Sequence, residues 1–206
     1  MQVHDLQYRP LRAGTSIINA RVNEPGTLGL IATDAAGANW IISCYHVLCD
    51  SGLGAYVQDD VVFQPAAVAN SNSIAVTSKT KANAGLDCAA AKIQPGITVS
   101  NEVLGIGAIA GITAGAIGMR VVKSGGTSGI TEGVISNVAA QTISIRIDSS
   151  FPLDYVLSEP GDSGSIWLEQ TTQRAVALHR GLNTPREAVA VPIQVVLNSL
   201  ALKQLP

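Results

Sequence analysis

The sequence has little net charge and few aromatic side chains. The chain has 13 Lys and Arg against 15 Asp and Glu, which gives a formal net charge of −2, and aromatic residues make up 4%. A nucleic-acid-binding surface needs clustered Lys and Arg, so we expect no nucleic-acid partner. Hydrophobic residues make up 47% and charged residues only 14%, a balance that favours a globular protein with extensive cores.

The sequence has no long hydrophobic run that reads clearly as a transmembrane helix. The nearest candidate, residues 103–119 ("VLGIGAIAGITAGAIGM"), is short for a membrane span and rich in Gly. Its start half-resembles a dinucleotide-binding loop, but such a loop needs a surrounding βαβ unit, and strand-like sequence follows instead. We expect a connector between two β units, no membrane partner and no organic cofactor.

Cysteine is also rare. Cys44, Cys49 and Cys88 are an odd number, and their spacings match no zinc template. The N-terminus has no apolar core of a secretory signal. Free, mostly buried thiols in a reducing compartment are the simplest interpretation, so we expect a cytoplasmic protein without a metal site. Whether Cys44 and Cys49 form a disulfide stays open at this point.

Short runs rich in Val, Ile and Ala recur along the whole chain, separated by Gly, Asn, Asp and Ser. Many short strands closed by turn residues predict an all-β sandwich or a pair of barrels. We place the boundary between two halves near residue 100. A helix is predicted after Pro192, because apolar residues recur there every three or four positions. Its apolar stripe is Ile193, Val196, Leu197, Leu200 and Ala201, with Leu205 one turn further.

A serine turn, "EPGDSGS" at residues 159–165, separates two apolar runs. Serine is a poor nucleophile unless a base lies beside it and a third group orients that base. Only three histidines are present. His4 lies in the N-terminal arm, His46 follows the strand-like "NWIIS", and His179 lies on the apolar run after the serine turn. His46 and His179 are therefore the candidates for chemistry.

Asp87 is the aspartate least suited to a solvated turn. It stands at the mouth of the apolar run "CAAAKI", where a carboxylate loses hydration unless it has partners. A carboxylate in such a place could orient a histidine ring.

The order of these residues along the chain distinguishes between the known classes of serine hydrolase. In α/β-hydrolases the serine precedes the acid and the histidine, but only Glu169 is available here, and "GDSGS" lacks the last Gly of that motif. The subtilisin order could use Asp34, but no parallel α/β pattern supports it. The remaining order, His46, Asp87, Ser163, is that of chymotrypsin.

With these residues, the chain resembles the chymotrypsin-like (trypsin-fold) serine peptidases, particularly bacterial members without a secretory pro-segment. The similar blocks extend from residue 26 to about residue 200. They are "GTLGLIATDAAGANWIISCYHVL" before and around the histidine, "LDCAAAKI" around the aspartate, the hairpin "VVKSGGTSGITEGVIS", "PGDSGS" at the serine, "AVALHRG" in the strand lining the substrate pocket, and the terminal helix.

The resemblance implies two six-stranded β-barrels with a C-terminal helix and a site between the barrels. Residues 1–100 would form the first barrel, which carries His46 and Asp87, and residues 101–206 the second, which carries Ser163. It further implies that Ser163 attacks the scissile carbonyl, His46 transfers the proton and Asp87 orients His46. The N–H groups of Gly161 and Ser163 would form the oxyanion hole.

The substrate pocket departs from a trypsin-like pattern. Leu157 stands where specificity for a basic residue requires a carboxylate, and Ser158, His179 and Arg180 complete the candidate pocket. "ALHRG" is similar to a strand of glutamate-specific bacterial peptidases. A preference for an acidic or for a small apolar residue before the scissile bond stays open.

The amino-acid sequence leaves two further questions open. The partner of Asp162 is unknown, because the chain has no "IVGG"-like start that could be released to pair with it. The function itself has three rivals: a trypsin-fold binding module that is catalytically silent, a peptidase that a regulatory protein must activate, and a self-processing protease module. The expected partner is in each case a polypeptide.

Overall fold

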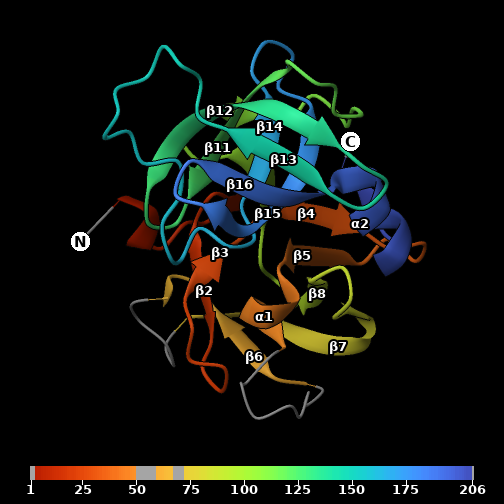
Figure 1. Ribbon diagram of the computed structural model, residues 1–206. Coiled ribbons are helices and arrows are strands. Elements are labelled where there is room, and N and C mark those ends of the chain that lie inside the picture. Colours follow the sequence, from red (N-terminus) through yellow and green to blue (C-terminus); the bar gives the residue numbers. More distant parts are fainter. Residues whose placement is uncertain (1–2, 50–58, 67–71, 206) are drawn as a thin grey trace.

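The computed structural model describes residues 3–49, 59–66 and 72–205. Strands dominate it, with one short 3₁₀ turn and two helices, and their arrangement is shown in Figure 1. None of the helices in these ranges has the length and hydrophobicity that crossing a membrane requires. The predicted all-β class is confirmed.

The C-terminal half contains a closed barrel of six antiparallel strands. It closes because β11 pairs with β12 on one side and with β14 on the other. Trp167, Ile135 and Ile143 point into its own hydrophobic core, which is distinct from the core of the other half. The strands are β11 (Arg120–Gly125), β12 (Gly129–Val138), β13 (Ile143–Arg146), β14 (Ile166–Glu169), β15 (Ala175–Thr184) and β16 (Glu187–Pro192).

The N-terminal half differs from the expected closed six-stranded barrel. Its described strands form an open sheet in the order β17-β4-β5-β8-β7-β6-β2-β3, beside a small sheet of β1, β9 and β10. The bounds are β1 (Leu11–Ala13), β2 (Ser16–Asn19), β3 (Gly26–Thr27), β4 (Leu30–Thr33), β5 (Asn39–Ser43), β6 (Val61–Phe63), β7 (Ser73–Asn83), β8 (Cys88–Ile93), β9 (Val99–Val103), β10 (Gly107–Ala108) and β17 (Lys203–Gln204).

The segment at residues 103–119 is a connector, as predicted. It leaves β9, forms the two-residue β10 and runs through turns into β11. The domain boundary near residue 100 stays a prediction, and β17, from the end of the chain, joins the sheet of the other half by pairing with β4. The two halves are thus connected by both the connector and the C-terminus.

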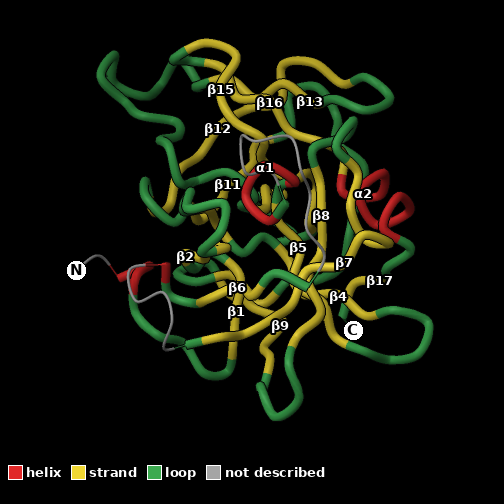
Figure 2. The backbone as a smooth tube through the Cα atoms, turned by 90° about the horizontal axis from the view of Figure 1, so that it is seen from below, coloured by secondary structure: helices red, strands yellow, loops and turns green. Residues whose placement is uncertain are grey.

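The C-terminal helix α2 (Ile193–Leu200) is shorter than predicted. Four residues of the expected stripe, Ile193, Val196, Leu197 and Leu200, are buried, whereas Ala201 is exposed. The four belong to the large core that the N-terminal half shares with part of the C-terminal barrel. The helix ends because Ala201 adopts a left-handed conformation with φ of 48°, which breaks the α-helical repeat. Leu205 therefore lies beyond β17 and not on a further helical turn. Figure 2 shows α2 at one side of the sheets, away from the one-turn helix α1 (Tyr45–Leu48).

Candidate active site

Antiparallel pairing of β5 with β8 brings His46 and Asp87 together. Ser43 at the end of β5 lies opposite Ala89 near the start of β8. His46 follows β5 on α1, which is anchored by two buried side chains, and Asp87 ends the turn that leads into β8. The register of two strands therefore places residues 41 positions apart in contact.

The Asp87 carboxylate holds the His46 ring by two hydrogen bonds. His46 Nδ1 lies 2.9 Å from Oδ2 and 3.0 Å from Oδ1, and the His46 backbone N–H donates to Oδ1 over 3.1 Å. Burial raises the pKa of Asp87, but the hydrogen bonds and charge of His46, with the charge of Arg180, outweigh it and lower the pKa below the ordinary value. An ionised carboxylate only accepts, so Nδ1 carries the proton and Nε2 presents its lone pair.

Ser163 and His46 line the same cavity, which has a volume of about 450 Å³. The Ser163 hydroxyl donates a hydrogen bond of 3.2 Å to the carbonyl oxygen of Arg180. The side chain of His46 is 34% exposed and that of Asp87 14%, so the ring is open to a substrate while the carboxylate is largely sheltered. The other lining residues are Glu24, Pro25, Thr127, Pro160 and Gly161.

Two carbonyls of the loop before Ser163 are hydrogen-bonded within the protein, which directs the N–H groups of the same peptides the opposite way. The carbonyl of Pro160 accepts from Thr127 Oγ1 over 2.8 Å, and that of Asp162 accepts from the Ser165 N–H over 3.0 Å. In a trans peptide the N–H points opposite to the carbonyl. Neither the Gly161 nor the Ser163 N–H has an acceptor within the described ranges. Both residues line the cavity, so both donors are available to a ligand there.

Glycine is required at position 161. Its φ of +101° is a conformation that side chains rarely adopt, and an added Cβ would collide with Thr127 Oγ1. The loop is also fixed from the other half of the molecule, because Thr27 Oγ1 donates to the Gly161 carbonyl and the Thr27 N–H donates to that of Ser163, each over 2.8 Å.

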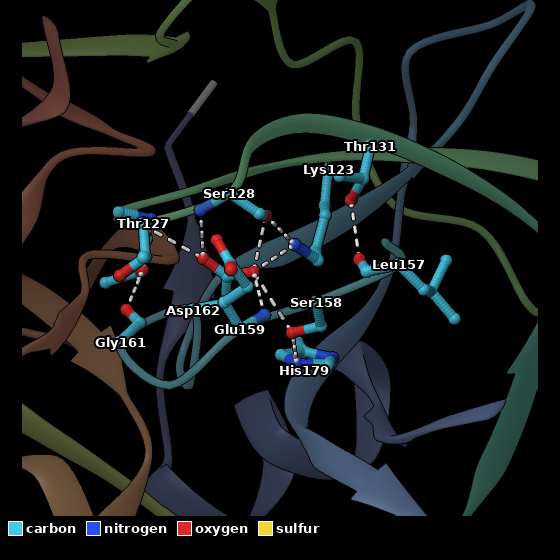
Figure 3. A network of polar contacts seen from close by, with 12 residues as sticks. Lys123, Thr127, Ser128, Thr131, Leu157, Ser158, Glu159, Gly161, Asp162 and His179 are labelled. Atoms are coloured by element: carbon cyan, nitrogen blue, oxygen red, sulfur yellow. Dashed lines mark hydrogen bonds and ion pairs between the residues drawn. The ribbon is translucent and has the colours of Figure 1, made fainter. Parts of the chain in front are cut away.

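Asp162 has a partner that sequence reasoning missed. Lys123 Nζ, from β11, lies 2.7 Å from Asp162 Oδ2, and both side chains are fully buried. Figure 3 shows the carboxylate enclosed by donors, which also include Ser128 and Ser158 side chains and backbone N–H groups. Burial raises the pKa of Asp162, but Lys123 and the surrounding hydrogen bonds lower it far more. The only signal in sequence was a Lys inside the apolar strand "RVVKSG".

His179 belongs to this buried network. The ring is 1% exposed, its Nε2 lies 2.8 Å from Ser158 Oγ, and its Nδ1 accepts from Trp167 Nε1 over 3.4 Å. Nε2 therefore carries the proton and donates to Ser158, which in turn donates to Asp162. Burial lowers the pKa of His179 to about 3, and Lys123 adds to this effect. The imidazole is thus neutral, with both nitrogens engaged.

The predicted pocket residues are therefore divided between two places. Leu157 and Ser158 are both buried; Ser158 contacts His179, and Leu157 accepts a hydrogen bond from Thr131 through its carbonyl. Arg180 lies elsewhere: its Nε is 3.5 Å from Asp87 Oδ2, and its side chain is 37% exposed. The structure does not bring Arg180 to the ring of His179.

Comparison with known proteins identifies the fold. No family model and no curated protein matches the chain. Among solved structures, a Nocardiopsis protease aligns with a TM-score of 0.71 at 18% identity, over 95% of this chain and 100% of that one. The chain has the chymotrypsin fold.

Two further structures support the same fold. A glutamic-acid-specific serine protease, described as using a histidine triad in substrate binding, aligns with a TM-score of 0.73 at 16% identity, over 95% of this chain and all of that one. A Cellulomonas bogoriensis chymotrypsin aligns with a TM-score of 0.67 at 18% identity, over 95% of this chain and 99% of that one. At such identities the likeness concerns the fold.

The cysteines of this chymotrypsin-fold chain are buried thiols, and no disulfide joins Cys44 to Cys49. A reducing compartment stays a prediction. Within the described ranges, Cys44, His46 and Asp87 offer ligand atoms within 4.8 Å of one another, the one group of this kind. Burial raises the pKa of Cys44 well above its ordinary value, and the other two residues bind each other. This donor set therefore suits hydrogen bonding better than metal binding.

Proposed function

We propose that the chain is a serine endopeptidase that cleaves peptide bonds through an acyl-enzyme on Ser163. The observation that carries this proposal is the shared cavity. It contains Ser163, a histidine whose ring Asp87 holds in the required tautomer, and two backbone N–H groups with no acceptor in the described part of the chain. These are the parts that acyl transfer by serine needs.

The proposed reaction follows from this geometry. Ser163 Oγ bonds to the scissile carbonyl carbon while its proton passes to His46 Nε2. The N–H groups of Gly161 and Ser163 stabilise the oxyanion. The C–N bond then breaks, His46 gives its proton to the leaving amine, and a water molecule activated by His46 releases the acyl group. Asp87 stabilises the imidazolium in both steps.

The buried network around Asp162 supports this function indirectly. Asp162 lies between the two proposed oxyanion donors, and Lys123 neutralises its carboxylate inside the barrel. The same carboxylate accepts from the N–H groups of Thr127 and Ser128, which belong to the adjacent hairpin. We infer that the network keeps the loop in one conformation, so that no partner is required for activity.

The pocket before the scissile bond is proposed to take a small apolar side chain. Leu157 has an apolar side chain, and the neutral ring of His179 already uses both nitrogens within the protein. A carboxylate placed there would find no free cation on the ring, which disfavours the acidic alternative.

Labelling with a fluorophosphonate probe tests the proposed function. We expect stoichiometric labelling of the wild type and none of Ser163→Ala. Ser165→Ala is the matched control, because Ser165 is a buried serine of the same loop whose Oγ has no hydrogen-bond partner among the described residues. Absence of labelling in the wild type would favour the silent module, and labelling only after addition of host lysate would favour activation by a partner.

A further inference from the structure

Arg180 contacts two of the three proposed catalytic residues. Its backbone carbonyl accepts the hydrogen bond of the Ser163 hydroxyl, and its Nε lies 3.5 Å from Asp87 Oδ2. The backbone is fixed in β15, whereas the guanidinium reaches out from the strand and is 37% exposed. The side chain therefore lies beside the His46–Asp87 pair and in contact with solvent.

The guanidinium lines a second cavity, of about 330 Å³, on the Asp87 side of His46. Arg180 is the only Lys or Arg among its lining residues, which are His46, Asp87, Arg180, Gly181, Leu182, Asn183 and Val189. The cavity that contains Ser163 also includes His46, but its charged lining residue is Glu24. On the Asp87 side of His46 a polypeptide would thus meet the guanidinium of Arg180, beside a carboxylate that His46 already engages, and on the other side it would meet Glu24.

Most of the hydrogen-bonding capacity of Arg180 is unused. A guanidinium has five N–H donors in a planar fork that fits a carboxylate. Its Nε faces Asp87, and no acceptor takes Nη1 or Nη2 within the ranges that the structure describes. Asp87 itself is occupied, because both of its oxygens accept from His46. The two Nη groups remain available to a substrate carboxylate.

We propose that Arg180 selects substrates with an acidic side chain at the second residue before the scissile bond. This inference rests on the proposed function. The resemblance assigns β15 to the wall that binds residues before the scissile bond, and the scissile carbonyl itself must lie at Ser163. The neighbouring residue of an extended substrate then lies about 3.3 Å further along, against the Arg180 cavity. This site is separate from the pocket around His179.

The experiment compares matched peptides that carry Glu or Gln at one position each, from four residues before to two residues after the scissile bond. For the wild type we expect kcat/KM to be at least ~10-fold higher with Glu than with Gln at the second position. The ratio should fall as salt is added, because the guanidinium is partly exposed. In Arg180→Gln the ratio should approach one.

The ratio, and not the rate, is the readout, because Arg180 also contacts Asp87 and its loss lowers activity on both peptides. Arg186→Gln is the control, since Arg186 is an exposed arginine of the same barrel that contacts the Leu153 carbonyl. If Arg180→Gln is too slow to assay, the salt dependence of the wild-type ratio decides.

Three results would overturn the inference: an unchanged Glu/Gln ratio in Arg180→Gln, a salt-independent ratio, or a preference at another position only. Failure of fluorophosphonate labelling would instead overturn the proposed function. Labelling without a charge preference would overturn the role of Arg180 alone.

Discussion

Asp162 in the serine loop and Asp87 beside His46 have very different surroundings. Asp162 is fully buried inside the C-terminal barrel, where Lys123 neutralises it and several N–H and O–H groups donate to it. Asp87 lies in the turn that leads into β8, with its side chain 14% exposed, and contacts one histidine and one arginine. Both have pKa values below the ordinary range.

This difference indicates a structural role for Asp162 and a role in the proposed reaction for Asp87. None of the donors around Asp162 takes part in the proposed proton transfer, so we assign its carboxylate the role of holding the loop in place. The ring that Asp87 holds can gain a proton, and its stabilisation then changes during a reaction. Low pKa values therefore do not distinguish the two aspartates, whereas the identity of their partners does.

The largest expected effect is on the rate in Asp87→Asn. An amide can donate to Nδ1 and so favour the wrong tautomer, and we expect kcat/KM to fall about 10⁴-fold. The free energy of unfolding should change by less than ~2 kcal/mol, because the site is partly open to water. Peptide hydrolysis and urea denaturation measure the two quantities. Asp148→Asn, at a surface pair with Arg120, is the control, and activity within tenfold of wild type would contradict the assignment.

Next in size is the loss of stability in Asp162→Asn. This change leaves the Lys123 ammonium buried without a counter-ion, and we expect the free energy of unfolding to fall by ~3–5 kcal/mol in urea denaturation. The double variant with Lys123→Met removes both charges and should be more stable than the single variant. A single variant as stable as the double one would show that the pair is not structural.

The effect that is smallest near neutral pH is the pH dependence that His179 adds to the barrel. The unfolded chain protonates this ring near pH 6.5, whereas the folded state keeps it neutral down to about pH 3. The unfolded state binds the extra proton between these values, so the free energy of unfolding falls with falling pH, by at most ~1.4 kcal/mol per pH unit.

Asp162 affects the free energy of unfolding at lower pH than His179 does. Its folded-state pKa is lowered, so its contribution to the free energy of unfolding is complete above the unfolded value of about 3.9 and is lost below it.

Urea denaturation of His179→Gln between pH 6.5 and pH 4, above the range of Asp162, tests the effect of His179. The free energy of unfolding should change less steeply with pH in this variant than in the wild type. His4→Gln is the matched control. An unchanged slope in His179→Gln would mean that the ring is not held neutral.

Several features were predictable because they depend on local sequence. The strands follow from short β-branched runs between turn residues, and the stripe of α2 follows from its spacing. The position where α2 ends was not predictable from the sequence. Leu202 packs into the core and Lys203 pairs with β4, and both of these are tertiary contacts. The same holds for the open N-terminal sheet, which differs from the expected barrel.

Chain order and residue type were enough to select His46, Asp87 and Ser163 as candidates, since few histidines and few sheltered carboxylates compete for the role. The sequence also placed a Gly at position 161, but only the structure showed why it is needed there, because the backbone angle disfavours a side chain and an added Cβ would collide with Thr127. The tertiary structure alone decided that Lys123 neutralises Asp162, that His179 is enclosed with it, and that Arg180 reaches Asp87. These contacts join residues far apart in the chain, and their distances depend on strand register and barrel closure, which no local pattern encodes.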